Sequence, residues 1–319
     1  NRARNSGKRI VFPDGTNPKV LKAAQILVDE GICRPLLIGP EWKVLARAEQ
    51  ANVDLTGIEV LEVAQDERFD AMSDALWTHR QRSGFTRSRA RRSLRSPTTF
   101  GCMLVREGYA DGLVGGLMLP YADTLRPALQ TIGTAPDASL VSGVYVMLFK
   151  DRQMFFGDCT VNVDPSAEKL AQIAVNTANV AASFGREPKV AMLSFSDFGE
   201  YRGSHDVDKV RQAVEILRKS HPDLMVDGEL QADTAVNPER AQDLFPFSPL
   251  QGQANVLIFP SLAAGNIAYK LLGELGGATT VGPLLVGLNK PVNALSLGSD
   301  VSDIVNITAL TVNQAMALD

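Results

Sequence analysis

The sequence predicts an α/β protein built on doubly wound parallel sheets, and three observations carry this prediction. Short apolar runs alternate with amphipathic helical stretches from the first residues onward, a rhythm that places each helix between parallel strands. The chain has 319 residues, enough for two compact domains. A hairpin-like segment interrupts the rhythm near the middle of the chain, so we place a domain boundary close to Ala138.

The predicted strands of the first half are short apolar runs bounded by turn residues. They comprise residues 9–12 (RIVF), 34–39 (RPLLIG), 58–63 (IEVLEV) and 111–116 (DGLVGG). The helix expected after the first strand, residues 17–31, has apolar side chains at helical spacing. Asn17 is a suitable N-cap, Pro18 suits the first turn, and Gly31 suits the C-terminal stop. A second helix is expected over residues 40–53.

An arginine-rich stretch lies between the third and fourth of these strands. Residues 70–108 are predicted to be helical throughout. The arginines within it, with no acid between them, are Arg80, Arg82, Arg87, Arg89, Arg91, Arg92 and Arg95. Such a charge run is normally a solvated helix face, and a phosphate-collecting surface is the alternative. A further helix is expected over residues 121–133.

The second half of the chain begins with a β-rich segment that interrupts the alternation of strands and helices. Residues 139–158 contain two β-rich runs around a polar Lys150-Asp151-Arg152 turn, which is typical of an antiparallel hairpin. The α/β rhythm then resumes. Helices are expected over residues 168–185 and 206–222, and strands over residues 189–195, 224–230 and 254–260.

The C-terminal region returns to a strand, a loop and a helix. Residues 288–305 read as a strand end, a polar loop that contains Ala294 and Leu297, and a helix start. The final helix, residues 301–318, is apolar on several sides, which predicts burial against another domain or a partner chain.

Composition excludes several classes of function. The net charge of −4 and the sequence pI of about 5.5 argue against a broad nucleic-acid surface. No run of apolar residues is long enough for a membrane span. Three scattered cysteines, Cys33, Cys102 and Cys159, indicate free thiols in a reducing, cytoplasmic compartment. The basic start without an initial Met suggests a piece of a longer protein.

Two segments at predicted strand ends are candidates for binding an anion. Residues 194–204 (SFSDFGEYRGS) offer hydroxyls and free amides before a helix, although Asp197 and Glu200 are unfavourable for phosphate. An ordinary surface loop is the alternative. Arg126, one turn into a helix, can clamp phosphate or pair with a nearby acid.

Metal and dinucleotide sites are not expected. His79, His205 and His221 show no metal-ligand spacing, and we assign them to surface or capping positions. The glycines of residues 112–116 lack the third glycine of a dinucleotide fingerprint.

The chain resembles phosphate acetyltransferases over essentially its whole length. The motifs that carry the resemblance are DGLVGG with ADTLRPALQ, REPKVAMLSFS, and VGPLLVGLNKPVNALSLG with DIVN. The loops SFSDFG and GPLLVGLNKPVNALSLG look most like the transferase-like C-terminal domain of hybrid NADP-dependent malic enzymes.

The resemblance implies a fold and a reaction. Two three-layer α/β domains would flank a cleft, as in the isocitrate and isopropylmalate dehydrogenase architecture. Residues 1–138 with 296–319 would form the first domain and residues 139–295 the second, with the last helix returning to the first domain in a homodimer. CoA thiolate would attack acetyl phosphate and release phosphate.

The resemblance also implies roles for individual residues. Arg126 matches a phosphate-binding arginine, and Arg80 aligns with a second one. Ser296 matches the serine of a family D-L-S-R-G run, and Asp303 matches the proposed base before the last helix. The remaining signature residues are Asn289, Lys290 and Asn293.

Two departures from the family pattern shape the functional prediction. Ala294 and Leu297 stand where active transferases carry Asp and Arg. Residues 197–201 (DFGEY) replace a Gly/Ser/Thr-rich loop, and their acids and aromatics are expected to repel or crowd phosphate. Losing one preorganised donor costs about 100–1000-fold in rate, so little turnover is expected.

The sequence therefore predicts a regulatory acetyl-CoA-binding domain without catalytic residues, with vestigial positions at Ser296, Asp303 and Arg126. NADP and a divalent Mg or Mn would serve only a malic enzyme domain in cis. The predicted acetyl-CoA ligand set comprises Arg80, Arg126, Ser194, Ser196, Asp197, Phe198, Gly199, Asn289, Lys290, Asn293, Ser296 and Asp303. The alternative is an active phosphate acetyltransferase with Asp303 as base, and a purely structural oligomerisation domain is a third possibility.

Overall fold

The computed structural model describes residues 3–136 and 138–318, which fall into two compact units. Unit 1 comprises Asn1–Ala135 with Leu288–Asp319, and unit 2 comprises Pro136–Gly287. The chain thus returns to unit 1 at Leu288, earlier than the boundary predicted at Ser296. The reason is that β11 (Val292–Ala294) completes the sheet of unit 1.

Unit 1 is built on a five-stranded sheet with the order β11-β4-β1-β2-β3, and every neighbouring pair is parallel. Its other strands are β1 (Arg9–Phe12), β2 (Arg34–Ile38), β3 (Glu59–Leu61) and β4 (Gly112–Gly115). The central strands are almost wholly buried on both faces, as expected for a parallel sheet covered by helices.

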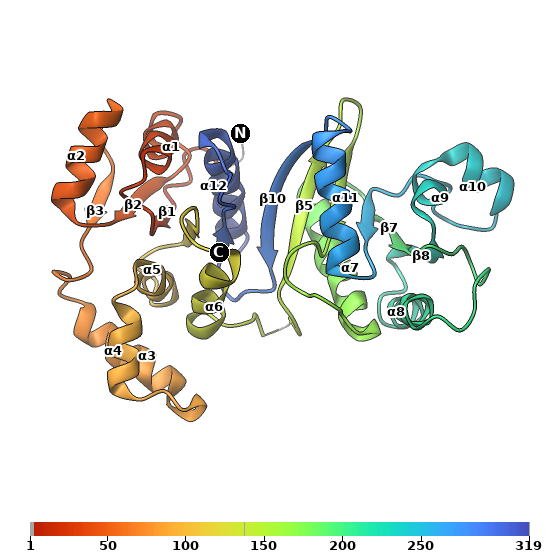
Figure 1. Ribbon diagram of the computed structural model, residues 1–319, viewed down its shortest axis with the longest axis horizontal. Helices are drawn as coiled ribbons and strands as arrows, with labels where there is room; N and C mark the ends of the chain where they lie inside the picture. The colour runs from red at the N-terminus through yellow and green to blue at the C-terminus, as the bar shows by residue number, and fades with distance from the viewer. Residues whose placement is uncertain (1–2, 137, 319) are drawn as a thin grey trace. The chain divides into compact units, whose positions relative to one another are not determined.

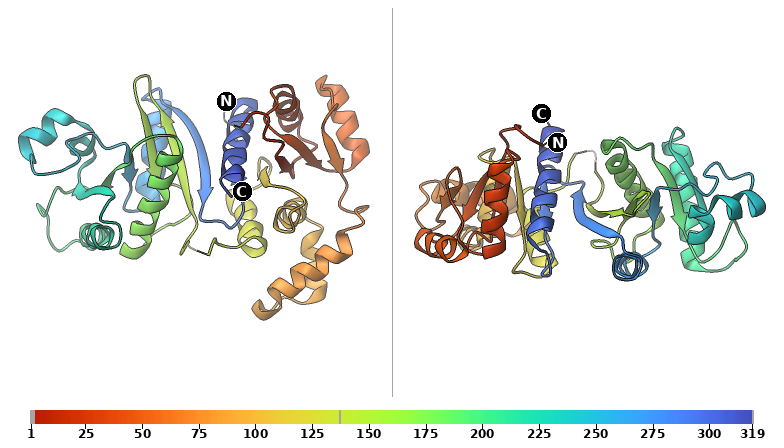
Figure 2. Two further views of the ribbon diagram at one scale, coloured as in Figure 1. Left: turned by 180° about the vertical axis from the view of Figure 1, so that it is seen from behind. Right: turned by 90° about the horizontal axis from the view of Figure 1, so that it is seen from above.

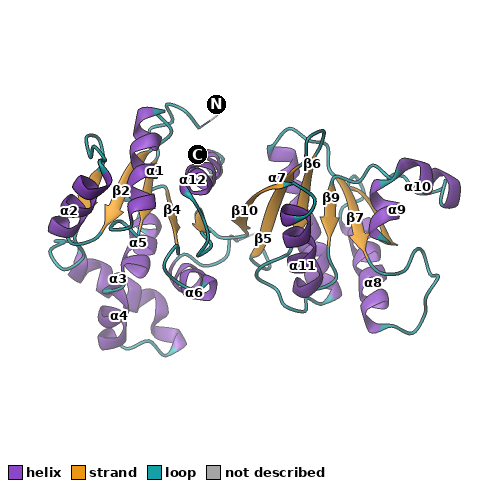
Figure 3. Cartoon of the chain, turned by 45° about the horizontal axis from the view of Figure 1, so that its top comes forward, coloured by secondary structure: helices purple, strands orange, loops and turns teal. Residues whose placement is uncertain are grey.

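Helices cover both faces of this sheet (Figures 1 and 3). One face carries α1 (Pro18–Asp29), α2 (Glu41–Ala51) and α12 (Val301–Met316). The other carries α5 (Pro97–Arg106) and α6 (Tyr121–Thr131). Right-handed crossovers require this arrangement, because the chain moves from β1 toward β3 and later back toward β11. At α1, Asn17 caps the helix by accepting from the Lys19 amide, as predicted.

The arginine-rich stretch is not one continuous helix. It forms α3 (Phe69–Arg80), a 3-10 turn (Gln81–Ser83), α4 (Arg87–Leu94) and then α5. Gly84 adopts φ +76°, a left-handed conformation that ends the first segment, and Ser96-Pro97 starts the last one. As a result α3 and α4 pack side by side (Figure 1).

The C-terminal segment corrects two further predictions. Ala294 lies in β11 and is fully buried, so it is not a loop residue. The buried face of α12, with Ile304, Ile307 and Val312, packs against α1 and β4 of its own unit, whereas Val305 and Leu310 are half-buried and Met316 is exposed. Figure 2 shows α12 beside α1.

Unit 2 contains a mixed six-stranded sheet with the order β10-β5-β6-β9-β7-β8. Its strands are β5 (Ser142–Leu148), β6 (Gln153–Gly157), β7 (Lys189–Leu193), β8 (Met225–Leu230), β9 (Val256–Ile258) and β10 (Thr279–Val286). The predicted hairpin is confirmed, because β5 and β6 pair antiparallel. Strands β6, β9, β7 and β8 run parallel.

The helices of unit 2 also lie on both faces of their sheet. They are α7 (Ala167–Ser183), α8 (His205–Ser220), α9 (Ala232–Val236), α10 (Pro238–Leu244) and α11 (Leu262–Glu274). The long helices α7 and α8 pack against each other. The sequence analysis missed α11, and among its residues only Gly265 is buried.

Candidate active site

The sheet of unit 1 has one topological switch point, between β1 and β4. From β1 the chain moves to β2 and β3 on one side, whereas β4 and β11 lie on the other. Ligands of open α/β sheets bind beyond the carboxyl ends of strands at such a point. Hydrogen bonds join the loops that follow β1, β4 and β11: Asp14 bonds to the loop after β4, and Lys19 of α1 bonds to the loop after β11.

Asp14 fastens two of these loops together. Its Oδ2 accepts hydrogen bonds from the amides of Gly116 at 2.8 Å and Leu117 at 3.1 Å. Burial raises the pKa of the Asp14 carboxyl above its ordinary value, and the bonds from the Leu117 and Gly116 amides oppose that shift. Gly116 has φ +93°, and a Cβ at this position would collide with Thr124 of α6. The glycine therefore lets the β4 loop lie directly against the helix that carries Arg126.

Arg126 reaches solvent from the second turn of α6. Its side chain is 65% exposed, and among the described residues its guanidinium pairs only with Asp123, with Nη1 3.4 Å from Oδ1. An exposed pair at this distance is weak. Both predicted roles are thus compatible with its position: the arginine has an acid nearby, and most of its guanidinium donors remain available to an anion.

The loop after β11 is tied by serines and by a lysine of α1. The Ser296 and Ser299 hydroxyls lie 3.0 Å apart, and the Ser296 amide donates to the Ser299 hydroxyl at 3.1 Å. Lys19 Nζ donates to the Ser299 carbonyl at 2.7 Å. Leu297, between these groups, is 67% exposed. The loop thus presents a hydroxyl and an apolar side chain to solvent.

Asp303 lies in the first turn of α12 as part of a capping box. Its Oδ2 accepts from the Asp300 amide at 2.9 Å, while the Asp300 Oδ1 accepts from the Asp303 amide at 2.8 Å. The second carboxylate oxygen of Asp303 has no hydrogen-bond partner within the described residues. The cap fixes the carboxylate, and the remaining oxygen can accept a proton.

The other predicted residues of unit 1 lie in different environments. Asn289 and Lys290 are exposed in the turn before β11. Asn293 is fully buried, and its amide donates to Thr311 Oγ1 at 2.8 Å and Gln314 Oε1 at 2.7 Å. Asn293 therefore joins β11 to α12 and does not face a ligand.

Arg80 ends α3. Its guanidinium lies 5.5 Å from the centre of the Phe85 ring, and its buried Nε lacks a hydrogen-bond partner among the described residues. Helix α3 also contacts α6, the helix that carries Arg126, and the predicted role of Arg80 as a second phosphate-binding arginine stays a prediction.

In unit 2 the predicted anion loop follows β7, and buried hydrogen bonds hold it. The Ser194 amide donates to the Leu230 carbonyl at 2.8 Å. Asp197 is buried, and it accepts from the Gln231 amide at 2.8 Å and from Thr234 Oγ1 at 3.2 Å. Ser196 is also buried, and its hydroxyl lies 3.4 Å from Glu229 Oε1. These polar groups anchor the loop and do not face solvent.

Glu229 is the centre of that anchor. Its side chain is 1% exposed, and its Oε1 accepts a hydrogen bond from the Gly199 amide at 2.7 Å. Arg211 of α8 donates to both carboxylate oxygens, at 2.8 and 2.9 Å, and also to the Tyr201 carbonyl at 2.6 Å. Hydrogen bonding with Glu229 raises the pKa of Arg211.

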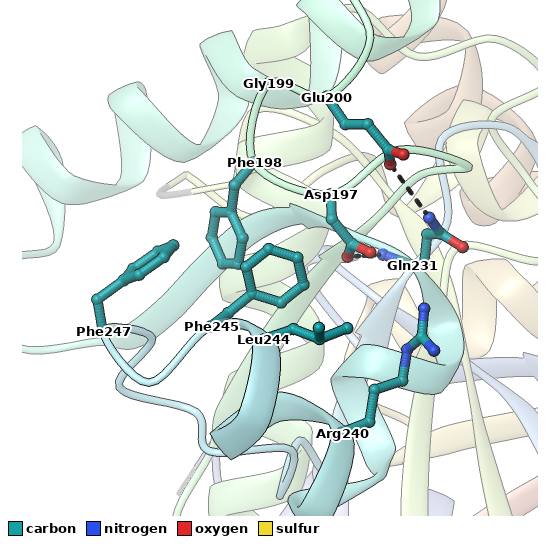
Figure 4. Close-up of a pocket in the computed structure, with 9 residues that line it drawn as sticks. All are labelled: Asp197, Phe198, Gly199, Glu200, Gln231, Arg240, Leu244, Phe245 and Phe247. Carbon is teal, nitrogen blue, oxygen red and sulfur yellow. Dashed lines mark hydrogen bonds between the residues drawn. The ribbon is translucent and has the colours of Figure 1, made fainter.

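Phe198 turns away from the strand ends and into an aromatic cluster. Its ring lies 5.1 Å from Phe245 and 4.8 Å from Phe247, measured between centres. These rings line a pocket of about 510 Å³ that also includes Arg240 (Figure 4). Asp197 and Phe198 are thus engaged within unit 2, whereas Glu200 and Tyr201 of the same stretch are exposed, so the expectation that residues 197–201 repel or crowd phosphate stays a prediction.

Several functional candidates escaped the sequence analysis. Lys19 lies in a helix that the sequence predicted and Asp14 follows a predicted strand, but no role had been assigned to either residue. The pairing of Glu229 with Arg211 spans 18 residues and depends on the β7–β8 register. The signal available for Asp14 in the sequence was an acidic residue close to the end of the predicted strand 9–12 and directly before a glycine.

The described residues form neither a metal-binding cluster nor a membrane-spanning helix. Within residues 3–136 and 138–318, no group of three or more His, Cys, Asp or Glu side chains is arranged to hold a metal ion. Across the same residues, every helix is too short or too polar to cross a bilayer.

Comparison with known proteins gives a consistent result. The family described as phosphate acetyl/butaryl transferase matches residues 1–312. A phosphate acetyltransferase from Thermoanaerobacterium thermosaccharolyticum is 44% identical over 98% of this chain and 97% of its own length. A phosphotransacetylase structure from Streptococcus pyogenes has a TM-score of 0.94 at 42% identity, covering 99% of this chain and 96% of that chain. The EutD phosphotransacetylase from Staphylococcus aureus has a TM-score of 0.90 at 42% identity, covering 98% and 96%.

These matches overturn the main functional prediction. A regulatory domain of an NADP-dependent malic enzyme, with its oxidoreductase and allosteric roles, is the wrong assignment. The relative from Thermoanaerobacterium is matched over nearly its entire length and is named phosphate acetyltransferase, which favours the alternative that the sequence had left open. The predicted two-domain α/β fold is confirmed by the two solved structures.

Proposed function

Because the chain belongs to the phosphate acetyl/butaryl transferase family, we propose that it is a phosphate acetyltransferase, which converts acetyl phosphate and CoA to acetyl-CoA and phosphate. The observation that supports this most strongly is the preserved set of groups at the switch point of unit 1. The segments that follow β4 and β11 carry a solvent-facing arginine, a serine hydroxyl and a carboxylate fixed by a capping box.

The chain's own residues supply each step of this reaction. The free oxygen of Asp303 accepts the proton of the CoA thiol, and the sulfur attacks the carbonyl carbon of acetyl phosphate. The new carbon–sulfur bond forms as the carbon–oxygen bond to phosphate breaks. Arg126 pairs with the phosphate dianion that leaves, and the Ser296 hydroxyl donates a hydrogen bond to the anionic oxygen.

Leu297 remains compatible with this proposal. Its side chain is 67% exposed, so it is not locked in place by packing within unit 1. Lys19, held against the Ser299 carbonyl, adds positive charge close to the same loop. The lost family arginine then reduces electrostatic stabilisation of the phosphate without removing the base.

We also propose a homo-oligomer located in the cytoplasm. Helix α11 and its C-cap residue expose Ile267, Leu271 and Leu275, which are 58%, 52% and 82% exposed. A row of apolar side chains at this spacing is typical of a helix that packs against another subunit. The three described cysteines are free and buried, as is usual in a reducing compartment.

A direct assay tests the function. The chain is expected to release phosphate from acetyl phosphate only when CoA is added, with formation of a thioester. Arg126→Ala is expected to lower kcat/KM by about 100-fold, because a charge-assisted contact to phosphate is lost. Arg47→Ala, a change of equal charge on exposed helix α2, serves as the control. A rate no higher than that in buffer would reject the proposal.

A further inference from the structure

The arginine-rich stretch of unit 1 takes little part in the proposed reaction. Residues 80–95 contain seven arginines and no acid. Because the whole chain carries a net charge of −4, the remaining residues together carry −11. The stretch belongs to the helix pair α3 and α4, which projects from one side of unit 1 (Figures 1 and 2). A strongly positive patch therefore lies on the surface of an otherwise acidic chain.

Five of these arginines belong to α4 and its C-cap. Ala90 and Leu94 of α4 are fully buried in the core of unit 1, and the arginines occupy the other sides of the helix. Arg87, Arg91 and Arg95 follow one another at intervals of four residues, so they form a row with steps of about 6 Å along the helix axis. We define the α4 arginine face as the exposed residues Arg87, Arg89, Arg91, Arg92 and Arg95.

Most guanidinium groups of the α4 arginine face have no protein partner. Arg91 pairs with Asp70. Within the described residues, the other four arginines form neither an ion pair nor a side-chain hydrogen bond. Like charges one helical turn apart repel each other and destabilise a helix. An anionic chain laid across the face would relieve this repulsion and use the donors that the fold leaves unsatisfied.

Aromatic side chains hold two of these arginines in place. The guanidinium carbon of Arg87 lies 4.3 Å from the centre of the Trp77 ring, and that of Arg89 lies 4.4 Å from the centre of the Phe85 ring. A guanidinium stacked on a ring keeps its N–H edge free and loses less freedom when it binds an anion. The same contacts occupy the two rings, so neither ring is available to stack on a nucleobase.

From these observations we propose that the α4 arginine face binds single-stranded nucleic acid through its phosphates, without reading its bases. Guanidinium groups pair bidentately with phosphate oxygens, and a flexible strand carries one charge on every nucleotide, which suits a row of regularly spaced cations. Arg91 contributes least, since Asp70 already neutralises it. The net negative charge of the chain excludes a broad nucleic-acid surface but not this local one, and the binding is separate from acetyl transfer.

Fluorescence anisotropy of a labelled 20-nucleotide thymidylate strand, titrated with the full chain, tests this proposal. Binding is expected with a Kd of about 1–100 μM at physiological salt. The slope of log K against log salt concentration should be about −2 to −3, which corresponds to about three or four neutralised phosphates. A strand of mixed sequence should bind within about twofold of the thymidylate, because phosphate contacts carry no sequence information.

Paired variants of equal charge locate the binding surface. Arg87→Gln/Arg92→Gln should weaken binding and bring the salt slope closer to zero by about 1.4. Arg34→Gln/Arg47→Gln is the matched control, because both arginines are exposed outside the face, and it should leave the slope unchanged. Thermal melts establish that both variants are folded. If loss of the Arg87–Trp77 contact unfolds the first variant, Arg92→Gln/Arg95→Gln keeps that contact and should give the same change of slope.

Several results would overturn the proposal. These are no change of anisotropy at 100 μM chain in 50 mM salt, or equal losses in the face variant and its control. Competition by a 20-residue poly-glutamate as effective as that by the unlabelled strand would instead assign the face to an acidic protein segment. Tighter binding to vesicles of anionic phospholipid would assign it to a membrane surface. Because the readout is binding, a failed acetyl-transfer assay would leave this test intact.

Discussion

The loop after β11 in unit 1 and the loop after β7 in unit 2 occupy equivalent places at strand ends but are built differently. In unit 2, the polar side chains Ser196 and Asp197 are buried and bonded within the unit. In unit 1, Ser296 and Leu297 face solvent, and one oxygen of Asp303 is unbonded. A loop whose polar atoms are already satisfied is a scaffold, whereas unsatisfied donors and acceptors are free for chemistry.

This difference changes how the sequence of each loop is interpreted. Asp197 and Phe198 were expected to repel or crowd phosphate. In the structure the Asp197 carboxylate bonds to Gln231 and Thr234, and the Phe198 ring packs on Phe245 and Phe247. The neutral loop at residues 296–299 looked impaired, yet it borders the fixed carboxylate of Asp303. We therefore expect substitutions at the loop after β11 and at Asp303 to change activity with little loss of stability. Substitutions at the buried Glu229–Arg211 pair of unit 2 are expected to lower stability more than activity.

The largest expected effect is on activity, at Asp303. Asp303→Asn removes the base but keeps an oxygen for the capping box, so kcat should fall by about 10²–10⁴-fold while Tm stays nearly constant. Asp300→Asn, which also preserves the cap, should retain most of the activity. Steady-state assays and thermal melts of both variants make the comparison. Equal activity in the two variants would remove Asp303 from the base role.

The second largest expected effect is a loss of stability when the pairing of Arg211 with Glu229 in unit 2 is broken. Arg211→Ala leaves Glu229 buried without its cation, which should lower the free energy of unfolding by about 3–5 kcal/mol. Arg4→Ala, which breaks an exposed pair with Glu30, should cost about 0–1 kcal/mol. Urea unfolding followed by circular dichroism measures both. Similar midpoints would show that the anchor contributes little.

A smaller gain in activity is expected at Leu297. Leu297→Arg restores a cation beside Ser296, and kcat/KM should rise about tenfold, less than for an enclosed donor because the side chain is exposed to water. Leu297→Gln, of similar length but neutral, should leave the rate unchanged. The same coupled assay measures both variants. A gain shared by both would indicate a steric cause instead of charge.

The smallest effect concerns the thiols, where the native protein should hardly react. Burial raises the pKa of Cys33 and of Cys102 to about 12, so about one thiol in 10⁴ is ionised near pH 8. Iodoacetamide should label neither residue in the folded chain and both in denaturant, as followed by mass spectrometry. Rapid labelling of the native chain would show that these sites open easily.

The periodic signals in the sequence predicted most of the first sheet and the hairpin, because buried strands and amphipathic helices impose local patterns. Residues 70–108 were misread as one helix, since a left-handed glycine and a Ser-Pro start break it within an otherwise helical composition. Helix α11 was missed because apolar residues stand on more than one of its sides: Ala268 and Leu272 pack on the core while Ile267 and Leu271 are exposed, so no amphipathic pattern marked it.

For the site, the sequence by itself determined the residue types, namely Arg126 on a helix start, Ser296 in a loop and Asp303 before a buried helix. Only the tertiary structure decided which of the candidates can act. Asn293 is committed to α12 and Asp197 to the β8–α9 turn, whereas Asp303 keeps a free oxygen. The physical reason is that a polar side chain is available to a ligand only when no partner distant in sequence has already satisfied it, and such partners are set by the packing of the fold.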